Sequence, residues 1–596
     1  MSGFIGLVSN KNVKNAILKA LKILQFNDDD STGVLFCGEK VFDVHRVVGK
    51  VDDLIPLIPS DADGTLGIGH TRWSTYTTHY LKNVYPIMSQ NKKVSLIIHG
   101  LIDNVIPLRR KLIKRGFQFK TDSAIEVVAN LIEENMAKGQ NSLKALSEAL
   151  LSLEGSYAVL AVFVDDPDRI YFAKNVIPVI IGKNEDSMMI TTDFPPIADL
   201  ATEYYYPKDK EIGYVTKDSL HVFNINLEAV DHEFTHTSVS EETLELGDYP
   251  HYMLKEIEEA PRVIKRLVNQ YFDGTKYKFD DKLIQRILDA DNIIFIAAGT
   301  SHNAALIGQR YLRNFNKKVD VFIASEWHFY PYQSGDNPLY VLISQSGETS
   351  DVLKCLDVID SYGGDVLAIT NTEVSTLYQR ADYRLLLHAG TEVSVASTKA
   401  YIAQITLLTL LYARLANKVT TISALDKVIK SIEELIKSRD VIKQIAQDVA
   451  KYKDVYFLGR GFDYDVAIEA QLKLKETTYI HSEAYAGGEV LHGPIALVDK
   501  GMPVVVFVSD AIAVEAMREV IVELEKREAN VIVCSATPFS VESDRFSTKT
   551  IVKVYHSPIV FAVFAQYLAY YTAVALGRNV DRPRNLSKAV KDRDVQ

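Results

Sequence analysis

The stretch from residue 292 to residue 312 reads NIIFIAAGTSHNAALIGQRYL and decides the fold of the larger part of the chain. It opens with a continuous apolar run, Asn292–Ala297, as is typical of a strand that is buried on both faces of a sheet. The turn Gly299-Thr300-Ser301 follows, and the apolar residues then take the spacing of a helix through Leu312. A strand, a tight turn and a helix in this order predict the first unit of a parallel α/β sheet.

The same order of elements continues downstream. A second strand is predicted at Leu339–Ile343, followed by the turn SQSGET at residues 344–349 and a helix through Asp360. Val366–Thr370 is the third strand of the series. Short apolar strands that alternate with longer helices favour a doubly wound α/β domain.

This domain is followed by a second copy. A strand is predicted at Asp454–Leu458, Phe295 corresponds to Phe457, 162 residues later, and Ser344 corresponds to Ser509, 165 residues later. A repeat of this length indicates a duplicated domain rather than a solenoid. We therefore expect two doubly wound α/β domains, at residues 275–420 and 435–596.

The first 240 residues are different in character, because strand-like runs outnumber helical stretches. The predicted strands are Gly33–Cys37, Val94–His99, Tyr157–Val164, Ile170–Ala173 and Pro178–Gly182. The predicted helices are Val13–Leu24 and Ser123–Met136. This pattern indicates an α+β domain with mostly antiparallel sheets over residues 1–240, joined to the repeats by a connector over residues 241–274.

Composition limits the classes of function. The chain of 596 residues has a net charge of −11 and a pI near 5.8, which argues against a nucleic-acid or anionic-membrane surface. Its three cysteines have no pair spacing, so we expect no disulfide framework and no cysteine zinc site, and a reducing, cytoplasmic compartment. The uncharged segment 557–577 contains Gln566 and Thr572 and is expected to be a buried helix rather than a membrane span.

Two turns in the first repeat suit an anion. Gly299-Thr300-Ser301 and the turn at residues 344–349 each follow a strand and open a helix, where free backbone N–H groups and the helix dipole favour negative charge. Ordinary helix capping by Ser and Thr is the alternative. Neither turn contains the lysine of a nucleotide-binding P-loop. Together they favour a site for a phosphate ester.

The second repeat carries the candidate reactive groups. Glu469, Lys473 and Glu476 lie four and three residues apart, hence on one helical face, although a salt-bridged surface face has the same spacing. The segment from His481 to Pro494 holds Glu and His residues but lacks a zinc-type pairing. No metal and no organic cofactor is expected.

Four segments in this half are long enough to be specific. They resemble segments of the glucosamine-6-phosphate synthase family, the isomerising glutamine:fructose-6-phosphate aminotransferases, and they occur in that family's order. The segments are SQSGETSDVL at 344–353, GTEVSVASTKAY at 390–401, QLKLKETTYIHSEAYAGGEVLHGP at 471–494 and PRNLSKAV at 583–590. The resemblance covers nearly the whole chain and implies two sugar-isomerase (SIS) domains, a sugar-phosphate substrate and a homodimer.

The resemblance also implies roles for single residues. Glu476 would move a proton between C1 and C2 of the sugar, and Lys588 would form a Schiff base with the open-chain ketose. His492 would assist ring opening from across a dimer interface, and Glu469 and Lys473 would support the site. Substrate-binding residues would be Ser344, Gln345, Ser346 and Thr349 at the phosphate, with Ser301 and Ser397 at the sugar.

The N-terminal segments TRW at 71–73, LIEE at 131–134 and PDRIYFAKN at 167–175 resemble a class II glutamine amidotransferase domain, which has an Ntn-hydrolase fold. That family opens Met-Cys-Gly and uses the exposed cysteine as its nucleophile. This chain opens Met1-Ser2-Gly3. Serine serves as a nucleophile in other N-terminal hydrolases, so this change alone does not exclude glutaminase chemistry.

Further differences predict a glutaminase domain that keeps its fold without its activity. The oxyanion motif His-Asn-Gly reads His99-Gly100-Leu101, and such a lost donor costs about 100- to 1000-fold in rate. The substrate-binding Asp falls on Ala124, and Thr-His-Gly reads Thr75-Tyr76-Thr77. Arg72 remains and could attract a carboxylate. A rebuilt pocket around Ser2 is the alternative.

Without glutamine hydrolysis, several functions remain open. The isomerase half could aminate fructose 6-phosphate with free ammonia or ammonia from a partner. It could also deaminate glucosamine 6-phosphate, or isomerise sugar phosphates without nitrogen. A non-catalytic regulator that binds a sugar phosphate is the alternative from another class, although it predicts damage to Glu476, His492 or Lys588, and the sequence keeps all three.

Overall fold

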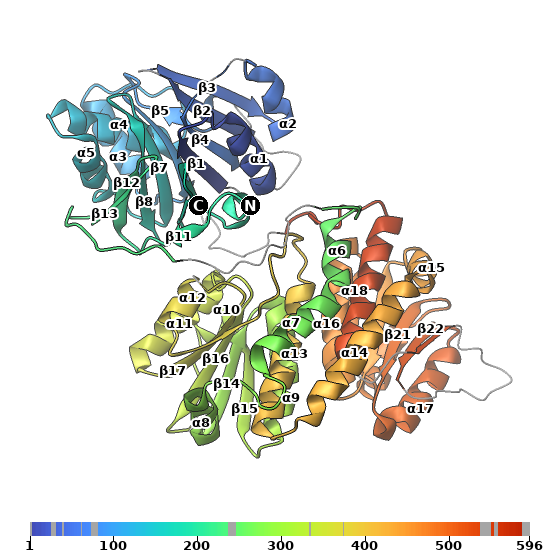
Figure 1. Ribbon diagram of the computed structural model, residues 1–596. Helices are drawn as coiled ribbons and strands as arrows, with labels where there is room; N and C mark the ends of the chain where they lie inside the picture. The colour runs from blue at the N-terminus through green and yellow to red at the C-terminus, as the bar shows by residue number, and fades with distance from the viewer. Residues whose placement is uncertain are drawn as a thin grey trace. The chain divides into compact units, whose positions relative to one another are not determined.

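The computed structural model describes residues 3–25, 31–38, 41–60, 62, 64–72, 81–235, 246–332, 335–373, 375–536, 550–553 and 558–586. The described residues up to 235 form one compact unit, and those from 246 to 586 form another (Figure 1). The predicted boundary at residue 240 lies outside the described residues and stays a prediction.

The first unit is built on two antiparallel sheets, as the sequence predicts. Among its described residues one sheet has the order β11-β9-β10-β1-β4-β2-β3 and the other the order β13-β12-β8-β7-β6-β5. The strands of the first sheet are β1 (Gly3–Ser9), β2 (Ser31–Gly38), β3 (Val41–Val48), β4 (Leu66–Arg72), β9 (Ile180–Lys183), β10 (Ser187–Thr191) and β11 (Glu203–Tyr205). The strands of the second sheet are β5 (Ile87–Met88), β6 (Val94–Gly100), β7 (Tyr157–Phe163), β8 (Asp166–Asn175), β12 (Glu211–Val215) and β13 (Leu220–Asn224).

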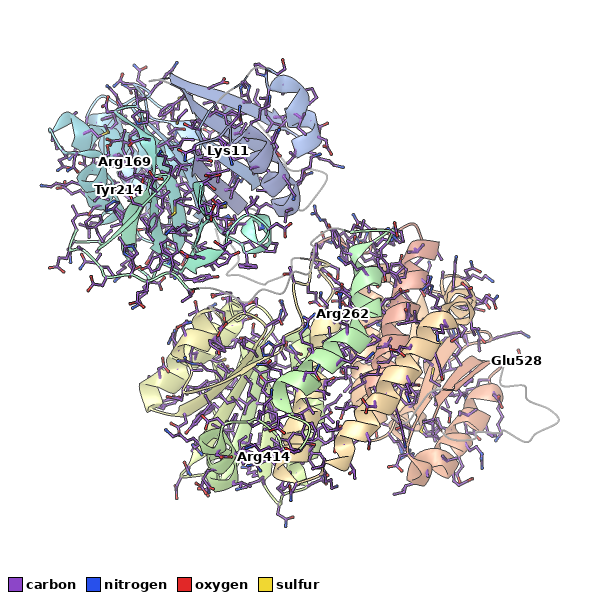
Figure 2. All side chains as sticks on the ribbon, viewed as in Figure 1. Lys11, Arg169, Tyr214, Arg262, Arg414 and Glu528 are labelled. Carbon is purple, nitrogen blue, oxygen red and sulfur yellow. The ribbon has the colours of Figure 1, made fainter. Side chains whose placement is uncertain are left out.

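Helices cover the outer faces of these sheets, which gives four layers. The five α-helices in the described part of this unit are α1 (Lys14–Leu24), α2 (Val51–Leu54), α3 (Val105–Lys114), α4 (Ala124–Ala137) and α5 (Ser142–Leu150). Phe4 and Leu160 belong to the core between the sheets, whereas Ile17 of α1 and Ile132 of α4 belong to the two outer cores. On the neighbouring strands β8 and β12, the Arg169 guanidinium lies 4.8 Å from the centroid of the Tyr214 ring (Figure 2).

The second unit contains two parallel sheets with the same strand order. One runs β15-β14-β16-β17-β18 and the other β20-β19-β21-β22-β23, so that each has the order 2-1-3-4-5 within the described residues. The first sheet comprises β14 (Asn292–Ala297), β15 (Lys318–Ile323), β16 (Pro338–Ser344), β17 (Asp365–Thr370) and β18 (Tyr383–Leu386). The second comprises β19 (Asp454–Gly459), β20 (His481–Ala486), β21 (Pro503–Val508), β22 (Asn530–Ser535) and β23 (Thr550–Lys553). The duplication read from the sequence is thus a duplication of topology.

A shared helical core joins the two sheets. Phe295 of β14 and Phe457 of β19 belong to the same apolar cluster, and helices fill the space between their sheets (Figure 1). The helices of this unit up to the second sheet are α6 (Tyr252–Glu258), α7 (Ala260–Tyr271), α8 (Asp281–Asp289), α9 (Gly299–Arg313), α10 (Ala324–Trp327), α11 (Ser350–Tyr362), α12 (Thr376–Arg380), α13 (Lys399–Leu415), α14 (Thr420–Lys437) and α15 (Arg439–Val449). Those that follow are α16 (Phe462–Thr478), α17 (Val514–Glu525) and α18 (Pro558–Ala575).

Helix α18 is the apolar segment for which the sequence predicts burial. It is long and apolar enough to cross a membrane, but 78% of its residues are buried inside the second unit. Tyr567 and Phe564 are fully buried in the shared core, as are the polar residues Gln566 and Thr572. The expectation of a buried core helix is confirmed.

Candidate functional site

The strand order of the first parallel sheet changes direction between β14 and β16, because β15 lies on one side of β14 and β16 lies on the other. In a parallel sheet this is the position at which the connections diverge and a ligand finds room. The turn at residues 299–301 opens α9 here, and the turn at residues 344–349 leads into α11. Both anion-binding turns predicted from the sequence therefore lie at one edge of the sheet.

Hydroxyl groups shape the turn at residues 344–349. The Oγ atom of Ser344 lies 2.8 Å from Oγ1 of Thr349 and accepts a 3.0 Å hydrogen bond from the Gly347 N–H. The Glu348 N–H donates to Ser346 Oγ at 3.1 Å. Gly347 has a φ of +67°, and a Cβ there would lie 2.0 Å from Ser375 Oγ. Only glycine fits this close approach.

The loop at residues 390–398 lies beside this turn. The Asn371 N–H donates to the Gln345 carbonyl at 2.9 Å, and the Asn371 side chain donates to the Gly390 carbonyl at 2.8 Å. Ser397, which is half-buried, therefore belongs to a loop tied to the candidate phosphate turn.

Two buried carboxylates hold the rest of this loop. Glu256 of α6 accepts hydrogen bonds from the Val393 N–H, from the Ser394 N–H at 3.1 Å and from the Ser394 hydroxyl. Glu392 accepts from the Thr398 N–H at 2.8 Å. The connector helix thus fixes the conformation of the loop that carries Ser397.

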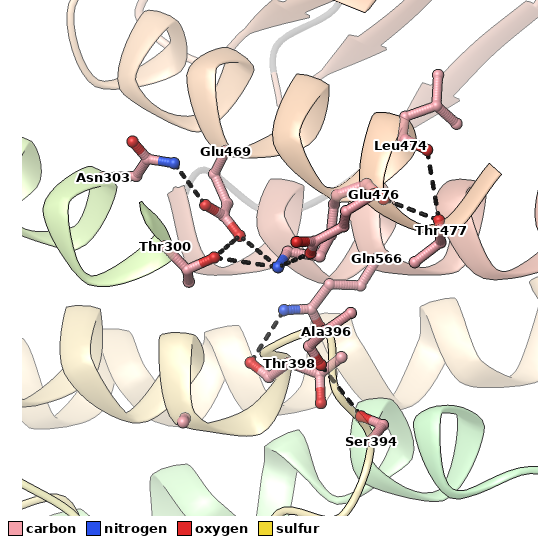
Figure 3. Close-up of polar contacts among 12 residues, drawn as sticks. Thr300, Asn303, Ser394, Ala396, Thr398, Glu469, Leu474, Glu476, Thr477 and Gln566 are labelled. Carbon is pink, nitrogen blue, oxygen red and sulfur yellow. Dashed lines mark hydrogen bonds and ion pairs between the residues drawn. The ribbon is translucent and has the colours of Figure 1, made fainter. Parts of the chain in front are cut away.

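A buried polar cluster joins the two repeats, as Figure 3 shows. The Lys473 ammonium lies 3.2 Å from Glu469 Oε1, contacts Glu476 and donates to the Thr300 hydroxyl at 3.0 Å. Thr300 in turn donates to Glu469 at 3.1 Å, and Asn303 donates to the same carboxylate at 2.7 Å. Side chains of α16 therefore meet the start of α9.

The electrostatics of this cluster follow from its burial. The Lys473 and Glu469 side chains are 1% and 2% exposed, so the alternative of a surface charge face is wrong. Burial lowers the pKa of Lys473, but the carboxylates of Glu469 and Glu476 outweigh it and hold that pKa above its ordinary value. Burial raises the pKa of Glu469, and Lys473 offsets part of this rise. Lys473 is therefore a cation at neutral pH.

Ser301 lies one residue beyond Thr300 and is fixed by a residue that sequence reasoning missed. Gln404 of α13 is fully buried and donates its amide N–H to Ser301 Oγ at 2.9 Å. Thr300, Asn303, Glu256 and Gln404 were not among the predicted residues. Thr300 could have been predicted from its place in the turn at 299–301. The other three could not, because their contacts join residues more than 100 positions apart and leave no local pattern in the sequence.

His492 and Lys588 are the remaining predicted residues of this half. His492 ends the 3₁₀ helix η4 (Glu489–His492) and is exposed. Lys588 lies outside the described residues. The tail leading to it is anchored at Tyr479, just after α16, because the Arg584 N–H donates to the Tyr479 hydroxyl at 2.7 Å and its guanidinium lies 4.1 Å from the ring centroid.

Arg72, Gly100 and Ala124, three of the predicted glutaminase-site residues, lie in the N-terminal unit. Ser2 and residues 73–80 lie outside the described residues, but Gly3 pairs with Thr71 on β4. The Arg72 guanidinium lies 5.2 Å from the centre of the Tyr85 ring. Gly100 has a φ of +111°, and a Cβ there would lie 2.2 Å from the Ser156 carbonyl oxygen.

Two histidines lie near Arg72. The His70 and His99 ring centroids are 6.3 Å apart, and burial, followed by His99 and Arg72, holds the pKa of His70 well below its ordinary value. Ala124 is the first residue of α4, where Ser123 caps the helix by accepting from the Ile125 N–H at 3.2 Å. Position 124 therefore lacks the carboxylate that the family places there.

Family comparisons agree with this division of the chain. The model of the SIS domain matches residues 286–414 and again residues 448–576. The model of a glutamine amidotransferase domain matches residues 70–198. The two SIS matches coincide with the two parallel sheets, and the third match lies within the antiparallel unit.

Relatives cover the whole chain. The glutamine–fructose-6-phosphate aminotransferase (isomerizing) of Listeria innocua serovar 6a is 35% identical over 601 residues, 99% of this chain and 100% of the relative. The protein of the same name from Thermococcus kodakarensis is 35% identical over 604 residues with the same coverage. The solved C-terminal domain of glucosamine-fructose-6-phosphate aminotransferase from Francisella tularensis is 31% identical, covers 56% of this chain and 99% of that chain, and has a TM-score of 0.53. The chain therefore belongs to the isomerizing glutamine–fructose-6-phosphate aminotransferase family.

Proposed function

We propose that the protein converts fructose 6-phosphate and ammonia into glucosamine 6-phosphate and water. The observation that carries this proposal is the cluster of Lys473 with Glu469 and Glu476, which contacts the turn at residues 299–301 through Thr300. The hydroxyl-rich turn at residues 344–349 lies at the same edge of the sheet, and relatives with this named activity match the chain from end to end. A sugar phosphate needs an anion site and an acid–base group within one cavity, and the elements that would provide both converge here.

The phosphate would bind at the turn of residues 344–349. Ser344, Gln345, Ser346 and Thr349 offer hydroxyl and amide donors, and α11 begins directly after them. Free N–H groups at the helix start favour the dianion. Ser301 and Ser397 would contact sugar oxygens.

Glu476 would carry the proton transfer. Ammonia adds to C2 of the open-chain ketose and water leaves, which gives a C2 imine. Glu476 would then take a proton from C1 while the imine nitrogen gains one, which gives a C1–C2 enolamine. Glu476 would return its proton to C2 and the C1 hydroxyl would release its own, so that C1 becomes the aldehyde carbon and C2 keeps the amine. This sequence needs no oxidant or reductant. Lys473 would hold the Glu476 carboxylate in place, and Glu469 would hold Lys473.

Two further roles complete the proposal. Lys588 would bind the ketose as a Schiff base before ammonia replaces it, and the anchoring of Arg584 at Tyr479 supports a tail that reaches the Glu476 end of α16. His492 would open the sugar ring in the active site of a second copy of the chain. Its exposure beside the exposed Leu491 and Leu497 supports a homodimer interface at this place.

We also propose that the N-terminal unit does not hydrolyse glutamine. The replacement of the nucleophile by Ser2, the missing oxyanion donor at Gly100 and the missing carboxylate at Ala124 support this. Ammonia would then come from solution or from a partner protein. The free cysteines Cys37, Cys355 and Cys534 are all buried, which supports a cytoplasmic enzyme without disulfides.

Product formation tests both proposals in one experiment. Fructose 6-phosphate is incubated with glutamine, with ammonium or with neither, and glucosamine 6-phosphate and glucose 6-phosphate are quantified. We expect glucosamine 6-phosphate with ammonium only. Glucosamine 6-phosphate with glutamine would contradict the loss of glutaminase activity. Glucose 6-phosphate alone would identify an isomerase, and the absence of any product would contradict the proposed reaction.

A further inference from the structure

Two glutamines occupy equivalent positions in the two repeats. Gln404 lies on α13 and Gln566 on α18, 162 residues later, which is the separation that also relates Phe295 to Phe457. Their side chains are 0% and 1% exposed. Burial of an amide costs free energy unless the amide forms hydrogen bonds. The hydrogen-bond partners of Gln404 and Gln566 therefore indicate the role of each side chain.

Gln404 controls the hydroxyl of Ser301. Its amide N–H donates to Ser301 Oγ at 2.9 Å. A hydroxyl has one proton and two lone pairs, so an oxygen that accepts from Gln404 still has its proton to donate. A sugar phosphate presents oxygens that accept hydrogen bonds. Gln404 thus holds Ser301 in the orientation of a donor to the substrate.

Gln566 does not make the equivalent bond in its own repeat. The counterpart of Ser301 there is Asp463, whose carboxylate accepts from the Ser509 N–H at 2.8 Å and from the Ser509 hydroxyl at 2.6 Å. Gln566 instead donates to the Thr398 carbonyl of the first repeat at 3.0 Å (Figure 3). Thr398 is the neighbour of Ser397. The glutamines of both repeats therefore converge on one sugar site.

Each glutamine also has an unpaired oxygen. Among the described residues, Oε1 of Gln404 and Oε1 of Gln566 have no hydrogen-bond partner. A buried acceptor without a donor lowers the stability of the fold, and an apolar side chain of the same length would remove this penalty. The stability of the fold therefore does not explain why amide side chains occupy these two positions. Their N–H groups, in contrast, have specific partners in the site.

We propose that Gln404 and Gln566 are positioning residues, which hold Ser301 and the loop of Ser397 against the sugar phosphate. This inference rests on the proposed function. The two glutamines differ in their partners because the second repeat contributes its glutamine to the site of the first.

Methionine variants test the inference. Q404M and Q566M keep the length of the side chain and remove both the N–H donor and the unpaired oxygen. We expect the KM for fructose 6-phosphate to rise about tenfold, the contribution of a lost hydrogen bond, with kcat reduced less and with Tm unchanged or higher. A lower Tm with an unchanged KM would show a structural role and overturn the inference.

Two controls separate the explanations. Gln309 of α9 donates to the Val319 carbonyl at 2.7 Å, away from the site, so Q309M is expected to leave KM unchanged. In the S301A background, Q404M is expected to add no further rise in KM, because Gln404 acts through Ser301. If Q404M raises KM in the S301A background as much as in the unchanged protein, Gln404 does not act through Ser301.

Calorimetric binding of fructose 6-phosphate distinguishes failure of the inference from failure of the proposed function. If the unchanged protein neither binds nor converts fructose 6-phosphate, both are wrong. If it does, and Q404M and Q566M bind with the same Kd, only the positioning role is wrong. We expect binding by the unchanged protein and an about tenfold higher Kd in both variants.

Discussion

The Lys473 ammonium lies 3.2 Å from Oε1 of Glu469, with both side chains buried on one face of α16. The same ammonium contacts Glu476, so one cation stands between two carboxylates. The Glu469 carboxylate is 2% exposed and that of Glu476 is 16% exposed, so without a cation the two would repel each other and Glu469 would be a buried charge without a partner. The stability of this region and the acid–base chemistry proposed for Glu476 thus depend on one side chain.

Replacement of Lys473 by methionine is expected to destabilise the protein by about 3–5 kcal/mol, the cost of leaving a buried charge without its partner. The loss depends on pH. Burial already raises the pKa of Glu469, and without Lys473 this pKa rises further. A carboxyl group with a raised folded-state pKa favours the folded state at low pH and disfavours it as pH rises through that value. Urea unfolding of K473M at pH 5.5 and pH 8 checks this, and it should show the smaller loss at pH 5.5.

The double variant K473M/E469Q serves as the control for that experiment. It removes the buried negative charge together with its cation, so part of the lost stability should return and the pH dependence should weaken. Equal instability of the single and double variants at both pH values would show that Lys473 acts through packing rather than charge.

Replacement of Glu476 by glutamine removes the proposed proton carrier and keeps the shape of the side chain. We expect kcat for glucosamine 6-phosphate formation to fall about 100- to 10,000-fold, with a KM for fructose 6-phosphate within a few-fold of the original. Steady-state kinetics with ammonium measure both. Glu515 of α17 has a side chain that is 79% exposed and is the matched control, because E515Q should retain the original kcat. An active E476Q would assign the proton transfer to another group.

Gly347 is predicted to be essential for the phosphate turn. Alanine at this position has to adopt a φ of +67° and places its Cβ 2.0 Å from Ser375 Oγ, so the turn has to move. We expect G347A to raise the KM for fructose 6-phosphate at least tenfold. Gly363 ends α11 at a φ of +71°, and a Cβ there would have no neighbouring atom within 4 Å, so G363A should cost only about 1–2 kcal/mol of stability and leave KM unchanged. The same KM in both variants would contradict a phosphate site here.

The sequence predicts the elements of the site better than its contacts. The run Asn292–Ala297 has the same bounds in the structure as in the prediction, because an uninterrupted apolar strand of a parallel sheet has a strong local signal. The spacing of Glu469, Lys473 and Glu476 correctly indicates one helical face. Spacing alone does not distinguish a buried face from an exposed one, because the same charges occur on both.

The long-range contacts needed the structure. Thr300 and Asn303 meet Glu469 across more than 160 residues of sequence, and Gln566 crosses from the second repeat to the first. These pairs depend on how α9, α16 and α18 pack, which the periodicity of each helix leaves open. The same limit holds for the polar role of Gln566, which the apolar sequence around it conceals.

Trapping of the proposed Schiff base tests Lys588 directly. Reduction of an imine between fructose 6-phosphate and a lysine by sodium borohydride fixes the sugar to the protein as a secondary amine, and the added mass is measured by intact-protein mass spectrometry. We expect one adduct per chain in the unchanged protein and none in K588A, because the tail that begins at Arg584 is anchored beside α16. K473M is the informative comparison: the cationic state of Lys473 makes it a poor nucleophile, so this variant should still form the adduct wherever it folds. An adduct that persists in K588A and is lost in K473M would transfer the covalent role from the tail to the buried cluster.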